Sequence, residues 1–460
     1  MTKKQRITLF SICAILFLLS AVSVIFYSQG FRFDFAQKKI AQTGAFYFKV
    51  SPKNSQIYID DKIRKRTDFL FNSSYIDNLL PRRYKVEIKK DGYFPWTKSL
   101  EVKEKEVTDA RNIVLVNQEL SFSVLASAIQ DVFFAPDEKK IIFLERQGDS
   151  WELKSFNLEI NIKSHILKPT DIAKDGADFN DLEFSPDSKR ALLKAGLKEK
   201  NSYFLIDMGA TPVRLTSLDF LGKEVEKIVF HPRDAQKLFL LDENKLKEGD
   251  LSQKKITPFE SGIVLDFAVS DGHIYYLESS GHLYKTDLGF DSRAKISESP
   301  FPIQQETKYE IIVLDGYVFI KSEEKNLYAL DQEKKEFTNL LEKNTDLKIS
   351  PDAGKIAYAS EFEIWVLFPK EQTHQPQKKS GEKIFLTRFS EKIDNLFWFG
   401  SYYLVFSAGD KIKIAEIDDR DQINIVDLAE FKNPEMRFNQ LDKKLYVFSE
   451  GKLLSSEPLF

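Results

Sequence analysis

The stretch Phe184-Ser185-Pro186-Asp187-Ser188-Lys189, followed by the apolar run Ala191-Leu192-Leu193, decides the fold because similar phrases recur along the chain. Each copy has an apolar anchor residue, a turn usually built on Pro-Asp or Asp-Gly, and a β-rich apolar run. Clear copies also begin at Phe134 and Ile349, and weaker ones at Phe230, Phe267, Val313, Phe397 and Phe438. Successive anchors lie 36 to 50 residues apart, with a mean of about 43. Such a period of strands and turns predicts a β-propeller.

The number and spacing of the anchors favour eight blades for residues 119–460. A seven-blade ring is the alternative, because the copy at Val313 is short and weak. The last repeat, residues 435–460, has room for about three strands, whereas a spare strand at residues 120–125 precedes the first repeat. Pairing the spare strand with the last three would close the ring and remove exposed sheet edges.

The phrase resembles the repeats of Tol-system and WD-like propellers, whose core reads Phe-Ser-Pro-Asp-Gly-Lys before an apolar strand. Residues 184–189 and 349–355 are the closest matches. Proline presets φ for a turn that Asp or Gly completes. Because Asp137, Asp187 and Asp352 recur at one repeat position, we expect them to have a structural role in turns.

An apolar segment near the N-terminus runs from Ile7 to Tyr27, 21 residues without a charge. As a helix it would be about 31 Å long, close to the hydrocarbon thickness of a bilayer. Lys3, Lys4 and Arg6 precede it, which predicts that residues 1–6 are cytoplasmic. A cleaved signal peptide is the alternative, but its apolar region is shorter and ends in small residues. The sequence therefore favours an uncleaved membrane anchor at residues 7–27, with the bulk of the chain outside the cytoplasm.

Residues 28–43 carry mixed charges and aromatics without a clear period, and we interpret them as a juxtamembrane stalk. From residue 44 to 118 the pattern alternates, with Phe46, Phe48 and Val50 on one face of a predicted strand. Asp60-Asp61 and Asp91-Gly92 stand where tight turns belong. This pattern predicts a small antiparallel β domain.

The segment 44–118 resembles the PEGA domain, a short β-sandwich-like module of exported prokaryotic proteins. The matching residues are Ser51-Pro52 after a strand, the strand Ile57-Tyr58-Ile59, Leu80-Pro81, and Lys90-Asp91-Gly92-Tyr93. The chain departs from the family at Pro52-Lys53-Asn54-Ser55, which replaces the eponymous Pro-Glu-Gly-Ala, and at Asp61 and Arg82, which replace glycines. The resemblance implies surface presentation and carries over no catalytic residue.

Composition narrows the function classes. The chain has 67 basic and 70 acidic residues among 460, so no strong field favours nucleic acid as a partner. The single cysteine, Cys13, lies in the apolar segment and excludes an intramolecular disulfide. Hydrophobic residues make up 42% of the chain, which is typical of a folded protein.

No motif in the sequence predicts catalytic, cofactor-binding or metal-ligating residues. A serine-hydrolase elbow of the form Gly-x-Ser-x-Gly is absent, and the histidines are scattered among the repeats, at positions 165, 231, 273, 282 and 374. A carboxylate pair of the glycosidase kind stays open, because acidic residues are abundant. We interpret the acidic cluster 416–421 as a solvated turn, and the polar stretch 370–383 as a loop that extends into solvent.

The sequence thus predicts an all-β, membrane-tethered envelope protein without enzymatic activity, whose propeller binds another envelope protein or a cell-wall glycan. The alternative is a propeller-based hydrolase or lyase that acts on cell-surface polysaccharide. What distinguishes them is whether unrelated acidic, histidine or arginine side chains converge at the mouth of the propeller channel. A third reading is a structural subunit of a larger envelope assembly.

Overall fold

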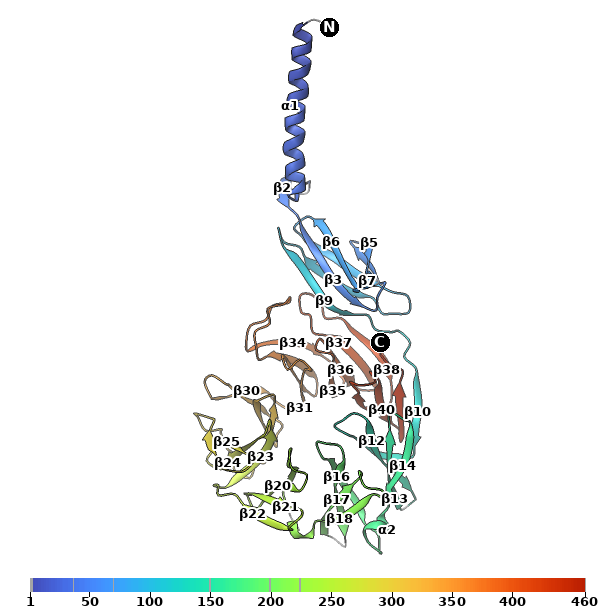
Figure 1. Cartoon of the computed structure of the whole chain (residues 1–460), viewed down its shortest axis with the longest axis vertical. Helices are drawn as coiled ribbons and strands as arrows, with labels where there is room; N and C mark the ends of the chain where they lie inside the picture. Colours follow the sequence, from blue (N-terminus) through green and yellow to red (C-terminus); the bar gives the residue numbers. More distant parts are fainter. Residues whose placement is uncertain are drawn as a thin grey trace.

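The computed structural model describes residues 3–35, 37–68, 70–148, 150–197, 200–222 and 225–459. It shows an all-β protein with one long N-terminal helix, as the sequence predicts (Figure 1). The helix projects from a small β domain, and a ring of four-stranded sheets follows. Residues 1, 2 and 460, at the ends of the predicted cytoplasmic and propeller segments, lie outside the described residues.

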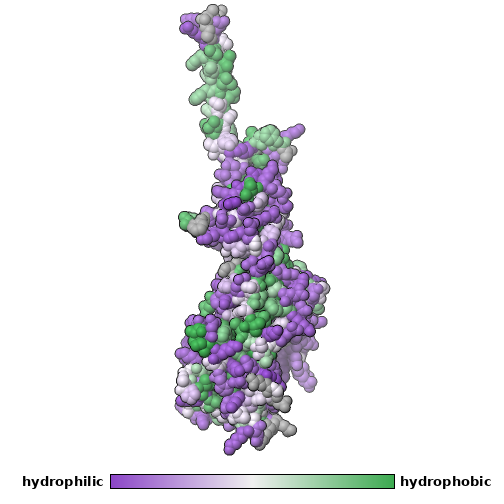
Figure 2. All heavy atoms as spheres, turned by 90° about the vertical axis from the view of Figure 1, so that its right-hand side faces the viewer, coloured by the Kyte–Doolittle hydropathy of each residue, from purple (hydrophilic) through white to green (hydrophobic). Residues whose placement is uncertain are grey.

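The helix α1 (Lys3–Ser28) contains a stretch from Gln5 to Ser28 with a mean hydropathy of 2.7. None of its most apolar window is buried against the rest of the protein, and Figure 2 shows hydrophobic residues along it above a mainly hydrophilic body. Three serine hydroxyls in the helix donate to backbone carbonyls of the preceding turn, at Phe17, Leu19 and Ile25. The helix is long and apolar enough to cross a bilayer, a property that signal sequences share.

A hairpin of two short strands, β1 (Phe31–Asp34) and β2 (Lys39–Gln42), follows the helix directly. The sequence gives this segment no strand pattern, since its apolar and charged residues do not alternate over a long enough run. Gly30 has φ +84° and makes the turn from helix to strand.

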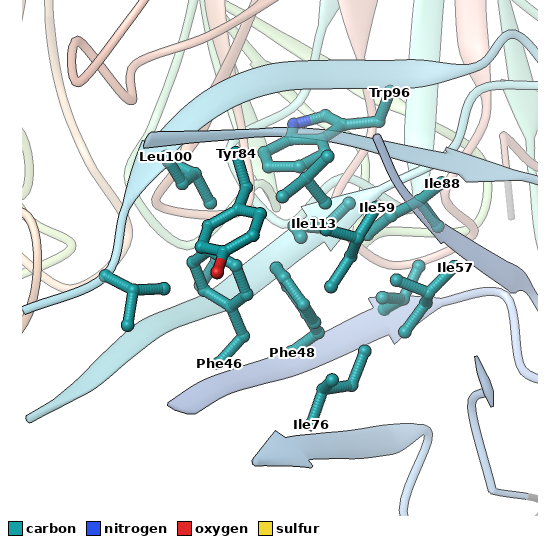
Figure 3. Close-up of a cluster of buried hydrophobic side chains, with 14 of the residues drawn as sticks. Phe46, Phe48, Ile57, Ile59, Ile76, Tyr84, Ile88, Trp96, Leu100 and Ile113 are labelled. Carbon is teal, nitrogen blue, oxygen red and sulfur yellow. The ribbon is translucent and has the colours of Figure 1, made fainter. Parts of the chain in front are cut away.

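The small β domain is a sandwich of two sheets. One sheet has the order β6-β3-β9 and the other has the order β5-β4-β7-β8. Their strands are β3 (Gly44–Ser51), β4 (Gln56–Ile59), β5 (Lys62–Arg66), β6 (Ser73–Leu79), β7 (Arg83–Lys89), β8 (Trp96–Glu101) and β9 (Val107–Val114). Figure 3 shows Phe46 and Phe48 of one sheet facing Ile57, Ile59 and Tyr84 of the other, all buried. The predicted turns are also found, with positive φ at Asp60, Asp61 and Gly92.

Eight four-stranded sheets follow between residues 122 and 456 of the described chain, the number that the anchor spacing favours. Seven are meanders in which strands pair antiparallel in sequence order. Sheets one to three are β11 (Ile129–Phe134), β12 (Lys140–Gln147), β13 (Ser150–Asn157) and β14 (Ile162–Leu167); β15 (Asp178–Phe184), β16 (Arg190–Leu197), β17 (Lys200–Asp207) and β18 (Arg214–Ser217); and β19 (Lys227–Phe230), β20 (Lys237–Asp242), β21 (Lys245–Asp250) and β22 (Lys255–Pro258). Short helices, α2 (Pro169–Ile172) and η1 (Asp219–Leu221), connect these sheets.

The remaining meanders follow the same plan. Sheets four and five are β23 (Val264–Ser270), β24 (His273–Glu278), β25 (Leu283–Asp287) and β26 (Arg293–Lys295); and β27 (Tyr309–Leu314), β28 (Tyr317–Ser322), β29 (Leu327–Leu330) and β30 (Phe337–Leu341). Sheets six and seven are β31 (Asn344–Ile349), β32 (Ile356–Ser360), β33 (Glu363–Phe368) and β34 (Glu382–Arg388); and β35 (Ile393–Phe399), β36 (Tyr403–Ala408), β37 (Lys411–Glu416) and β38 (Ile425–Glu430).

The eighth sheet joins the two ends of the ring. It contains β39 (Glu435–Phe438), β40 (Leu445–Ser449), β41 (Lys452–Ser456) and, at its edge, β10 (Phe122–Ser127). Phe122 pairs with Ser456 and Ser127 pairs with Lys452. This is the closure predicted from the spare strand and the three-strand last repeat, and it is confirmed.

Apolar clusters lie between neighbouring sheets. Leu144 of the first sheet, for example, belongs to one cluster with Leu193 and Phe204 of the second. At the closure, Phe143 of the first sheet shares a cluster with Leu453 of the eighth. All eight neighbouring pairs are bridged in this way, so the ring is closed and its core is distributed between the sheets.

The repeated phrase marks the end of the first strand of a sheet, as predicted. Five anchors are terminal residues of first strands: Phe134, Phe184, Phe230, Ile349 and Phe438. The other three anchors fall short of the strand end, because β23 continues beyond Phe267 to Ser270, β27 beyond Val313 to Leu314, and β35 beyond Phe397 to Phe399. In all three places several consecutive apolar residues precede the turn, so the pattern alone does not fix where the strand ends.

The turn aspartates are structural, as the sequence predicts. Ser185 Oγ donates to Asp187 Oδ1 at 2.6 Å, and the Lys189 amide donates to the same oxygen at 3.1 Å. Asp352 repeats the arrangement with Ser350 and the amide of Gly354. Burial acts to raise the pKa of the Asp187 carboxyl, but the hydrogen bonds from Ser185 and Lys189 outweigh it and lower this pKa. Asp137 likewise accepts from the Lys139 amide at 3.0 Å.

Candidate functional site

The first strands of neighbouring sheets line the centre of the ring, since β23 contacts β27, β31 contacts β35, and β35 contacts β39. One position recurs on these strands, three or four residues before the last residue of each first strand. In sheet order its occupants are Asp131, Asp181, Lys227, Asp266, Glu310, Asp346, Asn395 and Glu435. The pairing register shifts just before four of them, Asp131, Asp181, Asp266 and Asp346, and such bulges re-aim a side chain. Sequence reasoning missed this position, although its acidic bias was a readable signal.

Several of these side chains join one sheet to the next. Asp266 Oδ2 accepts a hydrogen bond from the backbone amide of Ile311 in the following sheet at 2.6 Å. Asp346 Oδ2 accepts from the Leu396 amide at 3.0 Å in the same way, and Lys227 Nζ donates to Asp266 Oδ1 at 2.9 Å. Burial raises the pKa of the Asp266 carboxyl, and Lys227 opposes that rise. Asp266 and Asp346 therefore stabilise the ring by joining neighbouring sheets.

Asp266→Ala should therefore lower the free energy of unfolding by about 2–3 kcal/mol, because the buried Ile311 amide loses its acceptor and the Lys227 ammonium loses its counter-ion. Glu310→Ala is the matched control, since Glu310 occupies the equivalent position but is exposed. Its change should stay within about 0.5 kcal/mol. The measurement is denaturant unfolding of the full chain in detergent. Equal effects of the two substitutions on the free energy of unfolding would contradict the role of Asp266 in joining neighbouring sheets.

Four other carboxylates lie on three consecutive first strands, β39, β11 and β15, and we call them the acidic arc: Glu435, Asp131, Asp181 and Glu183. Within the described residues, none of the four accepts a hydrogen bond from a neighbouring sheet. Glu435 and Glu183 are exposed, but the surrounding protein removes part of their water. This partial desolvation, and then the charge of Asp131, raises the pKa of the Glu435 carboxyl, and partial desolvation, and then the charge of Asp181, raises the pKa of the Glu183 carboxyl. Three of the four are repeat-equivalent, so the arc is mainly a consequence of the repeat.

The histidines lie away from the acidic arc. His165 is bonded to Glu152 on strand β13, with Nδ1 2.7 Å from Oε1. His231 Nδ1 accepts from the Asp234 amide in a turn after β19, and burial lowers the pKa of its imidazole. Within the described part of the chain, no group of three or more His, Cys, Asp or Glu side chains could hold a metal ion.

The densest polar contacts lie instead between the small β domain and the seventh sheet. Lys98 Nζ on β8 is 2.8 Å from Glu416 Oε1 at the end of β37, and both side chains are buried, with 0% and 4% exposure. Lys98 also donates to the carbonyl of Asp418 at 2.6 Å, and Trp96 Nε1 donates to Glu416 Oε2 at 2.7 Å. Burial raises the pKa of the Glu416 carboxyl, and Lys98 opposes it.

The prediction that residues 416–421 form a solvated turn is wrong. Besides Glu416, Asp418 is mostly buried and holds Arg420, whose Nε lies 2.9 Å from Asp418 Oδ1. Arg420 Nη1 donates to the Asp109 carbonyl of the small β domain at 2.6 Å. The Ser99 amide donates to Asp421 Oδ2 at 2.6 Å. Glu416 and Asp421 thus bind a basic group and an amide of the small β domain, whereas Asp418 holds Arg420 in place.

The prediction that residues 370–383 extend into solvent holds only in part, because most of the loop is exposed but its middle is bonded to the small β domain. Gln375 Oε1 accepts from the Asp109 amide at 2.9 Å, and its Nε2 donates to the Val107 carbonyl at 3.2 Å. Lys378 is buried and lies 2.6 Å from Asp419 Oδ2. The loop is a further element of the domain junction, which we define as β8 and β9 of the small β domain together with the segment 416–424 and the loop 370–383.

Two hollows open at this junction. One, with an empty volume of about 450 Å³, is lined by residues including Arg111, Phe368, Tyr402 and Arg420. The second is larger, about 1230 Å³, and is lined mainly by polar residues, including Arg83, Lys103 and Gln377. Two recesses thus lie at the boundary between the domains, where no sequence motif indicates a site, and a further one, of about 1450 Å³, lies between the fifth and sixth sheets, beside Tyr317, Leu340 and Leu367.

Comparisons with known proteins add little to this description. No family model matches the chain, and no curated protein matches it. Among solved structures, the chain is similar to the computationally designed Ika8 protein (12% identity, TM-score 0.47, 72% of this chain and 96% of that one). It is also similar to the β-propeller domain of Myceliophteria thermophila Cps50 (Swd1) (9%, 0.35, 61% and 99%) and to an oligogalacturonate lyase in complex with manganese (13%, 0.41, 74% and 96%). Likenesses this distant identify no activity.

The chain is therefore an all-β protein of the propeller class with an N-terminal apolar helix, on the basis of its own sheet topology. The function has to be argued from the chain itself.

Proposed function

We propose that this chain is a non-enzymatic, single-pass membrane protein that presents its propeller outside the cytoplasm to bind an envelope protein or a cell-wall glycan. The observation that carries the proposal is the exposed apolar helix α1, which projects from a folded body to which it is directly bonded. Lys3, Lys4 and Arg6 before the apolar run favour an N-terminus on the cytoplasmic side.

The small β domain acts as a spacer in this proposal. Its two-sheet sandwich and its turns at Asp60-Asp61 and Gly92 are compatible with the PEGA resemblance, which stays a prediction because no family model matches. The domain junction holds it firmly against the ring. Two rigidly joined bodies present a binding surface without an ordering cost on association.

The absence of a catalytic role is supported by the use of the ring carboxylates. Asp266 and Asp346 bond to the next sheet, and Asp137, Asp187 and Asp352 hold turns. Residues engaged in this way are poorly placed to touch a substrate.

To test the proposal, the full chain would be reconstituted in nanodiscs and used to capture material from detergent-solubilised envelopes. A stoichiometric protein or peptidoglycan fragment should be retained. Retention should survive Leu441→Asp, an exposed change, and disappear in Leu453→Asp, a change at the ring closure. Retention that is equal in all three forms would contradict binding through the propeller.

A hydrolase or lyase that acts on surface polysaccharide is the second candidate, and the acidic arc is what favours it. The raised pKa values of Asp131, Glu183 and Glu435 are a property that general acids share. Turnover of a chromogenic glycoside panel by the full chain, lost on Asp131→Asn or Glu435→Gln, would replace the binding proposal with this one.

A further inference from the structure

The hairpin β1–β2 is bonded to the helix end and to the small β domain. The amide and the hydroxyl of Thr43 both donate to the Gly30 carbonyl at 2.9 Å, and Gln42 Nε2 donates to the Gln29 carbonyl at 2.8 Å. Arg32 Nη2 donates to Asn78 Oδ1 on β6 at 2.6 Å. These contacts fix the hairpin beside the foot of α1, where Figure 1 shows it.

The hairpin exposes apolar side chains and buries a carboxylate, which is the reverse of the usual arrangement in a strand pair that faces water. Phe33 pairs with Ile40, so their side chains share one face, and they are 48% and 67% exposed. On the opposite face Asp34 and Ala41 are buried, with 6% and 2% exposure. Phe35, in the turn, is 83% exposed. Apolar side chains thus face outward while a carboxylate faces inward.

Aromatic and cationic groups surround the foot of the helix at the same level. The rings of Phe33 and Phe35 meet edge-on with centroids 5.0 Å apart, and Phe26 of α1 meets Phe31 in the same way at 5.3 Å. The Arg32 guanidinium lies 3.4 Å from the centroid of the Tyr27 ring. Lys38 and Lys39 of the hairpin are exposed. Aromatics with flanking cations are typical of the interface between bilayer and water.

We infer that the hairpin β1–β2 lies in the headgroup layer of the bilayer that receives α1, with Phe33, Phe35 and Ile40 directed toward the acyl chains. Lys38 and Lys39 then lie among the lipid phosphates. The inference rests on the proposed membrane anchoring. Its occupant is lipid because the apolar face begins three residues after a membrane-length helix, and Figure 2 shows a hydrophobic patch beside the foot of that helix.

The consequence is a two-point attachment. A single helix lets an outer domain swivel freely about the membrane normal and tilt, whereas a hairpin in the interface restricts the tilt. Because Arg32 joins the hairpin to β6, the restriction passes to the small β domain and, through the domain junction, to the ring.

The test uses the full chain in vesicles of phosphatidylcholine and phosphatidylglycerol, with an environment-sensitive fluorophore on single cysteines. Native Cys13, exposed on α1, reports whether the helix inserts. With Cys13→Ser as background, Phe35→Cys and Ile40→Cys report on the hairpin. Leu70→Cys is the matched control, because Leu70 is also apolar and 79% exposed. It precedes Ser73, which pairs with Lys49, so it lies about five residues of β3, roughly 17 Å, further from the helix than Gly44.

We expect the labels at positions 35 and 40 to emit at shorter wavelength than the label at 70, to be quenched by shallow spin-labelled lipid, and to be protected from iodide. If Cys13 is quenched by deep spin-labelled lipid but positions 35 and 40 behave like 70, the hairpin inference is overturned while the anchor stands. If Cys13 is not quenched, both are overturned. Protection from iodide without quenching by lipid would assign the face to a second copy of the chain and also overturn the inference.

Discussion

Lys98→Met is expected to lower the free energy of unfolding by about 3–5 kcal/mol, because it leaves the Glu416 carboxylate buried without its counter-ion. Lys98 also supplies hydrogen bonds to the carbonyls of Asp418 and Gln422, which the methionine cannot replace. The measurement is denaturant unfolding of the full chain, together with amide exchange at Ser99, whose N–H bonds Asp421 across the junction. Exchange at Ser99 should quicken as the two domains loosen.

The loss should be larger at pH 8 than at pH 5. Burial already raises the pKa of Glu416 while Lys98 opposes the rise, so removing Lys98 raises this pKa further. A carboxyl with a raised pKa in the folded state is protonated on folding at low pH, and its burial penalty grows as the pH rises through that pKa. A loss that does not change between the two pH values would contradict this account of the junction.

Two controls accompany Lys98→Met. Lys85→Met breaks the exposed pair with Asp61 and should leave the unfolding midpoint unchanged. The double variant Lys98→Met/Glu416→Leu should recover most of the stability, since it removes both charges together. Recovery should be incomplete, because Trp96 and Asn424 then lose their acceptor on Glu416.

Leu453→Asp should open the ring. Leu453 is fully buried on β41, in the cluster that joins the eighth sheet to Phe143 of the first. Losing the leucine packing costs about 3–5 kcal/mol, and placing a carboxylate there costs several more. Since β41 lies between β40 and β10, we expect the variant to expose β10 and the connection that follows it. Limited proteolysis should then cut near residues 127–129.

Leu441→Asp provides the matched comparison, because Leu441 carries the same side chain in the loop between β39 and β40 but is exposed. It should unfold at the same denaturant concentration as the parent chain and resist proteolysis near residue 128. If both variants resisted cleavage equally, the eighth sheet would not be what holds the ring shut.

Much of the fold follows from local patterns in the sequence. Turns built on Pro-Asp and Asp-Gly mark the ends of the first strands, because their backbone angles suit only a few residue types. In residues 44–50 apolar side chains alternate with others along the strand, which predicts that Phe46 and Phe48 face a core. The closure by β10 could also be predicted, since a three-strand repeat and an unpaired strand complete one another.

The domain junction could not be predicted in the same way, because its partners lie far apart in sequence; Lys98 and the Asp418 carbonyl are 320 residues apart. One signal was available. Lys98 alternates with Trp96 and Leu100 on the buried face of β8, and a lysine on such a face requires a buried partner. The partner's identity depends on how two domains meet, which no local pattern encodes. The hairpin was missed because four-residue strands are too short for a periodic signal.

The pairing of β10 with β41 has a consequence for biosynthesis. Ser123 and Ser455, which face one another across it, are 332 residues apart. At a translation rate of 5–20 residues per second, β10 waits roughly 20–60 s for its partner to leave the ribosome. During that interval one edge strand of the nascent ring is unpaired and exposed to solvent, so we expect a stalled or prematurely terminated chain to bind chaperones and to be degraded by quality-control proteases.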